Sequence, residues 1–178
     1  MLSVPATIDD LSREPPAATI CSVWQLVTDQ LMGGISKGVM GREVVAGRAA
    51  TRVRGDVSLE NNGGFIQAVL DFSPTAHVVD ASGWDGIAIH VFGNGEDYGV
   101  HLRTDYLARP WQSYRLNFTA SADWRTIILR FSTFAPHRTD VPLDIRRFRR
   151  IGLVAIGRDF RCDFAIGGLR YIGADTHG

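Results

Sequence analysis

The chain has 178 residues, 45% of them apolar, and its 19 Lys and Arg residues balance its 19 Asp and Glu residues. This balance argues against a nucleic-acid partner or an anionic membrane held by long-range attraction. The length predicts one domain with room for a substantial core. No apolar run has the length needed to span a membrane, and the first residues show no secretory signal, so we expect a cytoplasmic protein.

Short runs with a period of two dominate the sequence, and Gly, Pro, Asp and Ser separate them. This pattern predicts β-strands. The expected strands cover residues 48–54, 64–72, 86–92, 98–104, 112–118, 124–131, 151–156 and 164–172. Helical periodicity is scarce: Asp144–Arg150 is the best candidate, as one turn before the strand at Ile151. The spacing suits an all-β sandwich.

The domain organisation that we expect is one β-sandwich over residues 22–172. An N-terminal segment, residues 1–21, packs on it, and residues 173–178 form a tail. Pro15 and Pro16 exclude a central strand at that point. Cys21 and Cys162 lie near the two ends of the chain, where terminal strands often meet. The sequence leaves a disulfide open, and we favour two buried free thiols.

Two Gly-Gly pairs, Gly33-Gly34 and Gly63-Gly64, follow carboxylate and amide residues such as Asp29 and Asn61. Glycine is needed where φ is positive or where another part of the chain approaches closely. Asp and Asn side chains accept hydrogen bonds from turn amides. Strand-like sequence follows each pair, which excludes a phosphate-binding loop before a helix. The two motifs therefore predict two loops of specific shape.

No constellation for catalysis is present: there is no Gly-x-Ser-x-Gly motif, and neither cysteine has a catalytic signature. No histidines are paired at zinc-ligand spacing, so we expect no enzyme, no cofactor and no metal. Two alternatives stay open. His90 and His101, on consecutive strands, could be cross-strand neighbours that hold a metal. Loop oxygens could hold a structural calcium, from Asp29, Asp56, Glu60 and Asn61.

A polar face forms the candidate binding site. Three consecutive strands carry polar residues on the side opposite their apolar residues, and a loop tryptophan precedes the third strand. These candidates are His90, His101, Arg103, Trp111, Arg115 and Asn117. A curved sheet face with arginine, amide and aromatic groups suits a polar ligand or a peptide. The alternative is an ordinary solvated sheet face.

The glycine motifs carry a family resemblance. Their residues are Trp24, Asp29, Met32, Gly33, Gly34, Ser36, Glu60, Asn61, Asn62, Gly63, Gly64 and Phe65. They resemble the signatures of the complex I intermediate-associated protein 30 family, a tryptophan followed by TDGVMGGVS and then LENNGGF. The similarity extends over residues 22–172. Departures are Gln30 in place of glycine, Asn94 in place of aspartate, and Arg130 in place of proline.

The resemblance implies a galactose-binding-like β-sandwich of jelly-roll type with little helix, akin to several carbohydrate-binding modules. It also implies a non-enzymatic assembly factor, because the namesake of the family helps to assemble respiratory complex I and behaves like a chaperone for its intermediates. We therefore expect a bacterial protein-binding module. The alternative is a module that binds a carbohydrate or another small polar ligand, and fold analogy does not decide between them.

Overall fold

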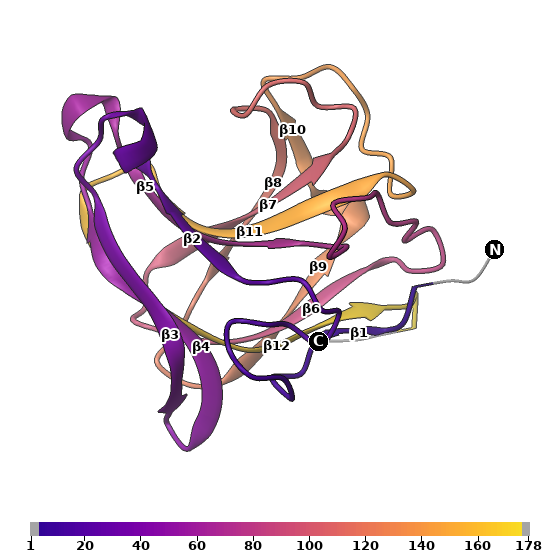
Figure 1. The fold of residues 1–178 in the computed structure, drawn as a ribbon, viewed down its shortest axis with the longest axis horizontal. Helices are drawn as coiled ribbons and strands as arrows, with labels where there is room; N and C mark the ends of the chain where they lie inside the picture. Colours follow the sequence, from indigo (N-terminus) through magenta and orange to yellow (C-terminus); the bar gives the residue numbers. More distant parts are fainter. Residues whose placement is uncertain (1–3, 176–178) are drawn as a thin grey trace.

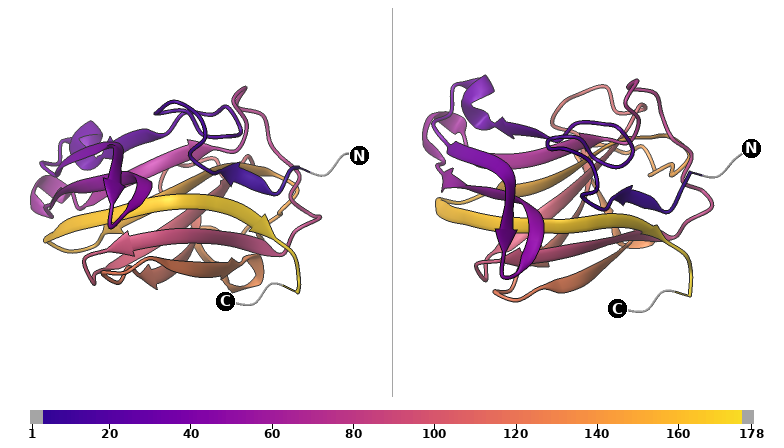
Figure 2. Two further views of the ribbon diagram at one scale, coloured as in Figure 1. Left: turned by 90° about the horizontal axis from the view of Figure 1, so that it is seen from below. Right: turned by 60° about the horizontal axis from the view of Figure 1, so that its bottom comes forward.

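Two antiparallel sheets of six strands each stack face to face in the computed structural model, which describes residues 4–175 (Figures 1 and 2). The strands are β1 (Thr7–Asp9), β2 (Gln25–Thr28), β3 (Lys37–Val45), β4 (Arg48–Val57), β5 (Phe65–Asp71), β6 (Gly86–Gly93), β7 (Asp97–Thr104), β8 (Ser113–Thr119), β9 (Arg125–Arg130), β10 (Ala135–His137), β11 (Phe148–Ile156) and β12 (Phe160–Ile172). Three short 3-10 segments complete the regular structure: η1 (Asp29–Met32), η2 (Glu60–Asn62) and η3 (Phe131–Thr133). The expected all-β sandwich is confirmed.

The strand order separates neighbours in the sequence. Sheet I has the order β3-β4-β12-β6-β9, with β1 paired to β12. Sheet II has the order β10-β8-β7-β11-β5-β2. Consecutive strands β6 and β7 therefore belong to different sheets, and the turn between them crosses the sandwich.

The core lies between the sheets because alternate residues of each strand turn inward. On β6 these are Ile87, Ile89 and Val91, and on β7 they are Val100 and Leu102, all at most 1% exposed. Phe148 and Phe131 meet edge to face, with ring centroids 5.1 Å apart. The residues between the inward ones form the two outer faces, and this alternation places every polar candidate of the sequence.

The alternative in which His90 and His101 are cross-strand neighbours that hold a metal is wrong. His90 lies on the outer face of sheet I, where its ring nitrogen Nδ1 is 2.7 Å from Thr126 Oγ1 on β9. His101 lies on β7, which pairs with β8 and β11 in sheet II. The sequence shows that apolar and polar residues alternate on both strands. It does not show to which sheet each strand belongs, because that depends on the tertiary structure.

Other expectations need smaller corrections. The Asp144–Arg150 segment forms a single turn, closed by one main-chain hydrogen bond from Arg147 N–H to Asp144 O, and β11 begins at Phe148. Strand β3 was not expected, because Gly38 and Gly41 weaken its pattern. Strands β1, β2 and β10 have only three or four residues each, too few to show a period.

Both cysteines are free thiols, but only Cys162 is buried. Cys21 is exposed in a turn with a φ of 74°, away from the core, so the expectation of two buried thiols is wrong for Cys21.

Near the N-terminus, Trp24 Nε1 donates a 2.8 Å hydrogen bond to buried Asp9 Oδ2. Trp24, a family-motif residue, thus ties the first segment to the sandwich.

Residues 1–3 and 176–178, parts of the expected N-terminal segment and of the expected tail, lie outside the described residues. Among residues 4–175, no helix has the length and apolar character required to traverse a bilayer.

Candidate functional site

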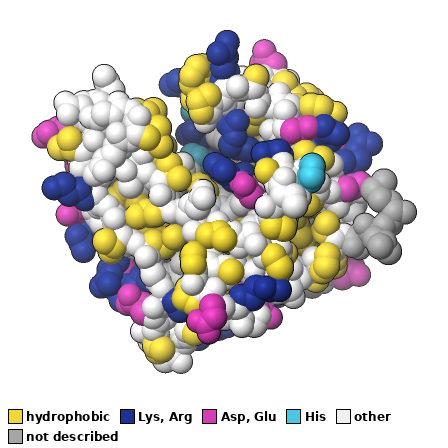
Figure 3. All heavy atoms as spheres, viewed as in Figure 1, with side chains coloured by type: hydrophobic (Ala, Val, Ile, Leu, Met, Phe, Trp, Pro, Cys, Tyr) yellow, Lys and Arg dark blue, Asp and Glu magenta, His cyan; other side chains and the backbone are white. Residues whose placement is uncertain are grey.

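The outer face of sheet II is the floor of a cleft. Its outward residues alternate with core residues along five strands. They are Ala135 and His137 on β10; Ser113, Arg115 and Asn117 on β8; Gly99, His101 and Arg103 on β7; Arg150, Gly152 and Val154 on β11; and Gln67, Val69 and Asp71 on β5. Figure 3 shows the hollow as a notch between two lobes, with basic side chains at its base.

The first wall of the cleft, here called the glycine lobe, consists of residues 29–36 and 58–65. Fully buried Asp29 joins its two loops. Its carboxylate accepts hydrogen bonds from Ser36 Oγ at 2.5 Å, from Ser36 N–H at 3.0 Å and from Gly64 N–H at 2.5 Å. Burial by itself raises the pKa of Asp29, but these hydrogen bonds outweigh it and lower the pKa below 3.8.

The glycines are required by this same carboxylate. A Cβ on Gly34 would lie 2.4 Å from Asp29 Cγ, and one on Gly63 would lie 2.5 Å from Asp29 Oδ2. Gly33 and Gly64 are needed for a different reason: their φ values are positive, at +86° and +127°. The family motif thus builds a rigid lobe around one internal carboxylate.

Large apolar side chains cover the outside of the glycine lobe. Leu31 is 69% exposed and Met32 is 59% exposed, and Ile35 and Leu59 are also exposed. In Figure 3 hydrophobic side chains lie on the side of this lobe that faces the notch. An exposed apolar cluster on a rigid lobe indicates a contact surface, because apolar area exposed to water is unfavourable until a partner covers it.

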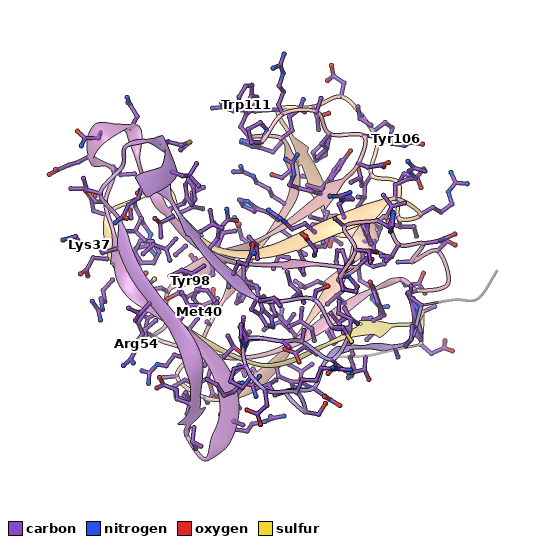
Figure 4. The ribbon with its side chains drawn as sticks, in the orientation of Figure 1. Lys37, Met40, Arg54, Tyr98, Tyr106 and Trp111 are labelled. Carbon is purple, nitrogen blue, oxygen red and sulfur yellow. The ribbon has the colours of Figure 1, made fainter. Side chains whose placement is uncertain are left out.

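The second wall is the loop of residues 105–112 between β7 and β8. The Arg103 guanidinium holds it from the floor by donating to the main-chain oxygens of Leu107, Arg109, Pro110 and Gln112. Trp111 and Tyr106 are each 52% exposed on this wall. Figure 4 shows both on the lobe across the notch from η1 and η2.

Gly99 is buried at the centre of the floor, under polar side chains of β7 and β8. The point where a Cβ would stand on Gly99 is 3.3 Å from His101 Nε2 and 3.4 Å from Asn117 Oδ1. Burial, and then the charges of Arg115 and His137, lower the pKa of His101 to about 3. His101 is therefore a neutral imidazole at physiological pH, and two polar groups converge above the glycine.

Beside them lies an uncompensated positive charge. Arg115 is half-buried, and its Nε donates a 2.8 Å hydrogen bond to Ser113 Oγ. Burial and then Arg138 lower the pKa of Arg115, and burial, Arg115 and Arg138 lower that of His137. By contrast, Arg150 Nε lies 2.7 Å from Asp71 Oδ1. Among the described residues, no carboxylate forms an ion pair with Arg115 or Arg103.

The structure thus brings together most of the predicted face. His101, Arg103, Arg115 and Asn117 share the floor, Trp111 stands on one wall, and His90 lies on the other sheet. Sequence reasoning missed His137 and Arg138, because β10 is too short to be recognised. It also missed Gly99 and Gly152, whose positions on the outward side of buried strands were the available signal.

The calcium alternative does not fit the geometry. The oxygens of Asp29 point inward and accept N–H and O–H hydrogen bonds. Asp56 lies on β4 and pairs with Arg161 at 3.3 Å. Glu60 and Asn61 are exposed in η2. The carboxylates of Asp29 and Asp56 already interact with hydrogen-bond donors of the protein, so they are not available to a calcium ion.

A two-sheet sandwich with a cleft across one sheet defines a galactose-binding-like binding fold. A family model named Complex I intermediate-associated protein 30 matches residues 15–166. The chain therefore belongs to the complex I intermediate-associated protein 30 family, as the glycine motifs predict. No curated protein matches the chain.

Solved structures share the fold. A family 11 carbohydrate-binding module from Clostridium thermocellum, in complex with a β-1,3-1,4-mixed-linked tetrasaccharide, is 16% identical with a TM-score of 0.75, covering 97% of each chain. The family 11 module of the cellulase Lic26A-Cel5E from the same organism is 15% identical, with a TM-score of 0.74 and 99% of each chain covered. A family 30 carbohydrate-binding module is 10% identical, with a TM-score of 0.69, covering 96% of this chain and 89% of that one.

Proposed function

We propose that this chain is a non-enzymatic binding module that holds a segment of a partner protein in the cleft over sheet II, in the assembly of respiratory complex I. One observation carries the proposal: an exposed apolar lobe flanks a floor whose arginine Arg115 has no carboxylate partner among the described residues. A protein segment offers both apolar side chains and negative or carbonyl oxygens to such a surface. The family name and the cytoplasmic location expected from the sequence support this role.

A first experiment uses the exposed apolar cluster. The tagged chain is incubated with solubilised membranes of its source organism, and complex I subunits are sought by mass spectrometry. Met32→Glu places a charge on the glycine lobe and should abolish recovery. Val44→Glu is the matched control, because Val44 is 72% exposed on β3 of the other sheet. Equal recovery with both variants would contradict the proposed cleft contact.

A second candidate is a glycan-binding module. The observation in its favour is the convergence of His101 Nε2 and Asn117 Oδ1 above Gly99, where sugar hydroxyls could donate and accept hydrogen bonds. The similar family 11 module was solved with a mixed-linked tetrasaccharide. Calorimetry with that tetrasaccharide distinguishes the candidates. Binding that Asn117→Ala removes would favour the glycan, whereas we expect no heat of binding.

A further inference from the structure

Arg115 lies on the cleft floor, on β8 between β10 and β7. Its partner on β10 is the small residue Ala135, its partner on β7 is His101, and its outward neighbours along β8 are Ser113 and Asn117. The Nε atom is taken by Ser113 Oγ. In the described part of the chain, neither terminal nitrogen of Arg115 has a protein partner. The planar end of this guanidinium is thus directed to a ligand or to solvent.

The other floor arginines are already used by the protein. Arg103 donates to main-chain oxygens of the 105–112 loop, and Arg150 pairs with Asp71. Arg115 therefore differs from both, because its two terminal nitrogens have no partner in the described part of the chain and can bind a ligand. His137 lies diagonally across from it on β10, opposite Ser113, and Arg138 follows at the strand end.

The ionisable groups that act on one another at this point are all basic. The neighbours that depress the pKa values of Arg115, His101 and His137 are Arg115 itself, His137 and Arg138, all of them basic. Each such repulsion is a cost to the free protein that an incoming anion removes. The site is also partly desolvated, which strengthens a charge-assisted hydrogen bond.

We propose that Arg115 and His137 form a subsite for the carboxylate of an acidic side chain in the partner segment, an inference that rests on the proposed function. A carboxylate matches the two parallel donors at the end of an arginine. A flat membrane surface does not fit, because Arg115 lies on the outer face of sheet II, which is hollowed by the notch that Figure 3 shows. The apolar glycine lobe, at the opposite side of the cleft, fits apolar side chains farther along the same segment.

The test uses a capped hexaglutamate peptide as probe, with capped hexaglutamine as its uncharged counterpart, and two-dimensional NMR of the whole chain. Hexaglutamate should shift the signals of residues 99–103, 113–117 and 135–138, and hexaglutamine should not. Arg115→Met keeps the length but removes the charge and should weaken the affinity about tenfold or more. Arg125→Met is the control, because exposed Arg125 lies on β9 of sheet I. His137→Ala, on an edge strand, provides a second variant if Arg115→Met unfolds.

The outcomes separate this inference from the proposed function. Uniform shifts, equal weakening by Arg125→Met, or unchanged affinity in both site variants would overturn the subsite. Selective binding of trigalacturonate instead of hexaglutamate would also overturn it, in favour of an acidic glycan. If Arg115→Met still recovers complex I subunits, the subsite fails while the proposed function stands. If hexaglutamate binds as expected but the wild-type chain recovers no subunits, the subsite stands and the proposed function fails.

Discussion

Asp29 and Arg115 are two charged residues of the same cleft with opposite surroundings. Asp29 is fully buried, and its carboxylate is satisfied by donors from Ser36 and Gly64. Arg115 is half-buried, and the nearby charge of Arg138 repels it. The first charge is satisfied within the fold and therefore builds structure. The second is unsatisfied within the described chain and is therefore the better candidate for a ligand.

The outer face of sheet I supports the same distinction. Arg52 lies between Glu43 at 2.7 Å and Asp163 at 2.8 Å, and its hydrogen bonds to Asp163 and then Glu43 raise its pKa. Such a network on a sheet face stabilises strand pairing and leaves no charge for a partner. The number of arginines does not distinguish the outer faces of sheets I and II. The hydrogen-bond and ion-pair partners of each arginine distinguish them.

The largest expected effect comes from crowding Asp29. Gly63→Val would place its Cβ 2.5 Å from Asp29 Oδ2 and should lower the free energy of unfolding by about 3 kcal/mol. Gly41→Val is the matched control, because no atom lies within 4 Å of its Cβ position. Urea unfolding followed by circular dichroism measures both. Equal stability of the two variants would contradict a structural role for the glycine lobe.

Removing the charge of Asp29 comes next. Asp29→Asn keeps the shape but turns an amide toward the N–H of Gly64, and it should cost about 2 kcal/mol at neutral pH. Because the folded pKa is lowered, the advantage of the wild type is present above 3.8 and is lost as the pH falls through the folded pKa. Unfolding of both proteins over an acid pH series checks this, and a constant difference would speak against it.

The two floor arginines should differ in stability. Arg103→Met releases the main-chain oxygens of the 105–112 loop and should cost about 1.5 kcal/mol. Arg115→Met relieves repulsion from Arg138 and should change stability by less than about 0.5 kcal/mol. Thermal unfolding compares them directly, and acrylamide quenching of Trp111 fluorescence should rise for Arg103→Met alone. A larger loss for Arg115→Met would make it the structural residue.

The effect that is smallest at neutral pH concerns the protonation of His101. His101 should stay neutral in the folded protein down to mildly acid pH, since its pKa is lowered to about 3. The unfolded chain takes up this proton near its ordinary value of 6.5, so His101 makes stability fall as the pH drops from that value toward 3. NMR titration of the ring signals measures it. Protonation near the ordinary value would mean that the cleft floor is wetter and less charged than described.

The sequence predicted the sandwich because apolar and polar residues alternate along its strands. It predicted the two loops of the glycine lobe because Gly-Gly pairs after Asp and Asn residues are typical of turns with a specific shape. It also placed His101, Arg103, Arg115 and Asn117 on one face, since they occupy alternate positions on two consecutive strands of one sheet. It failed for His90, because the turn after β6 crosses from sheet I to sheet II. No local pattern reports such a crossing.

The sequence by itself determined the periodicity, the turn chemistry and the membership of the family, all of which are local properties of the chain. Only the tertiary structure decided which charges are paired. Arg52 finds Asp163 across more than a hundred residues, Arg103 is taken by a loop, and Arg115 is left facing the cleft. Ion pairs join residues that the sheet order brings together, so the availability of a charge for a partner depends on the fold.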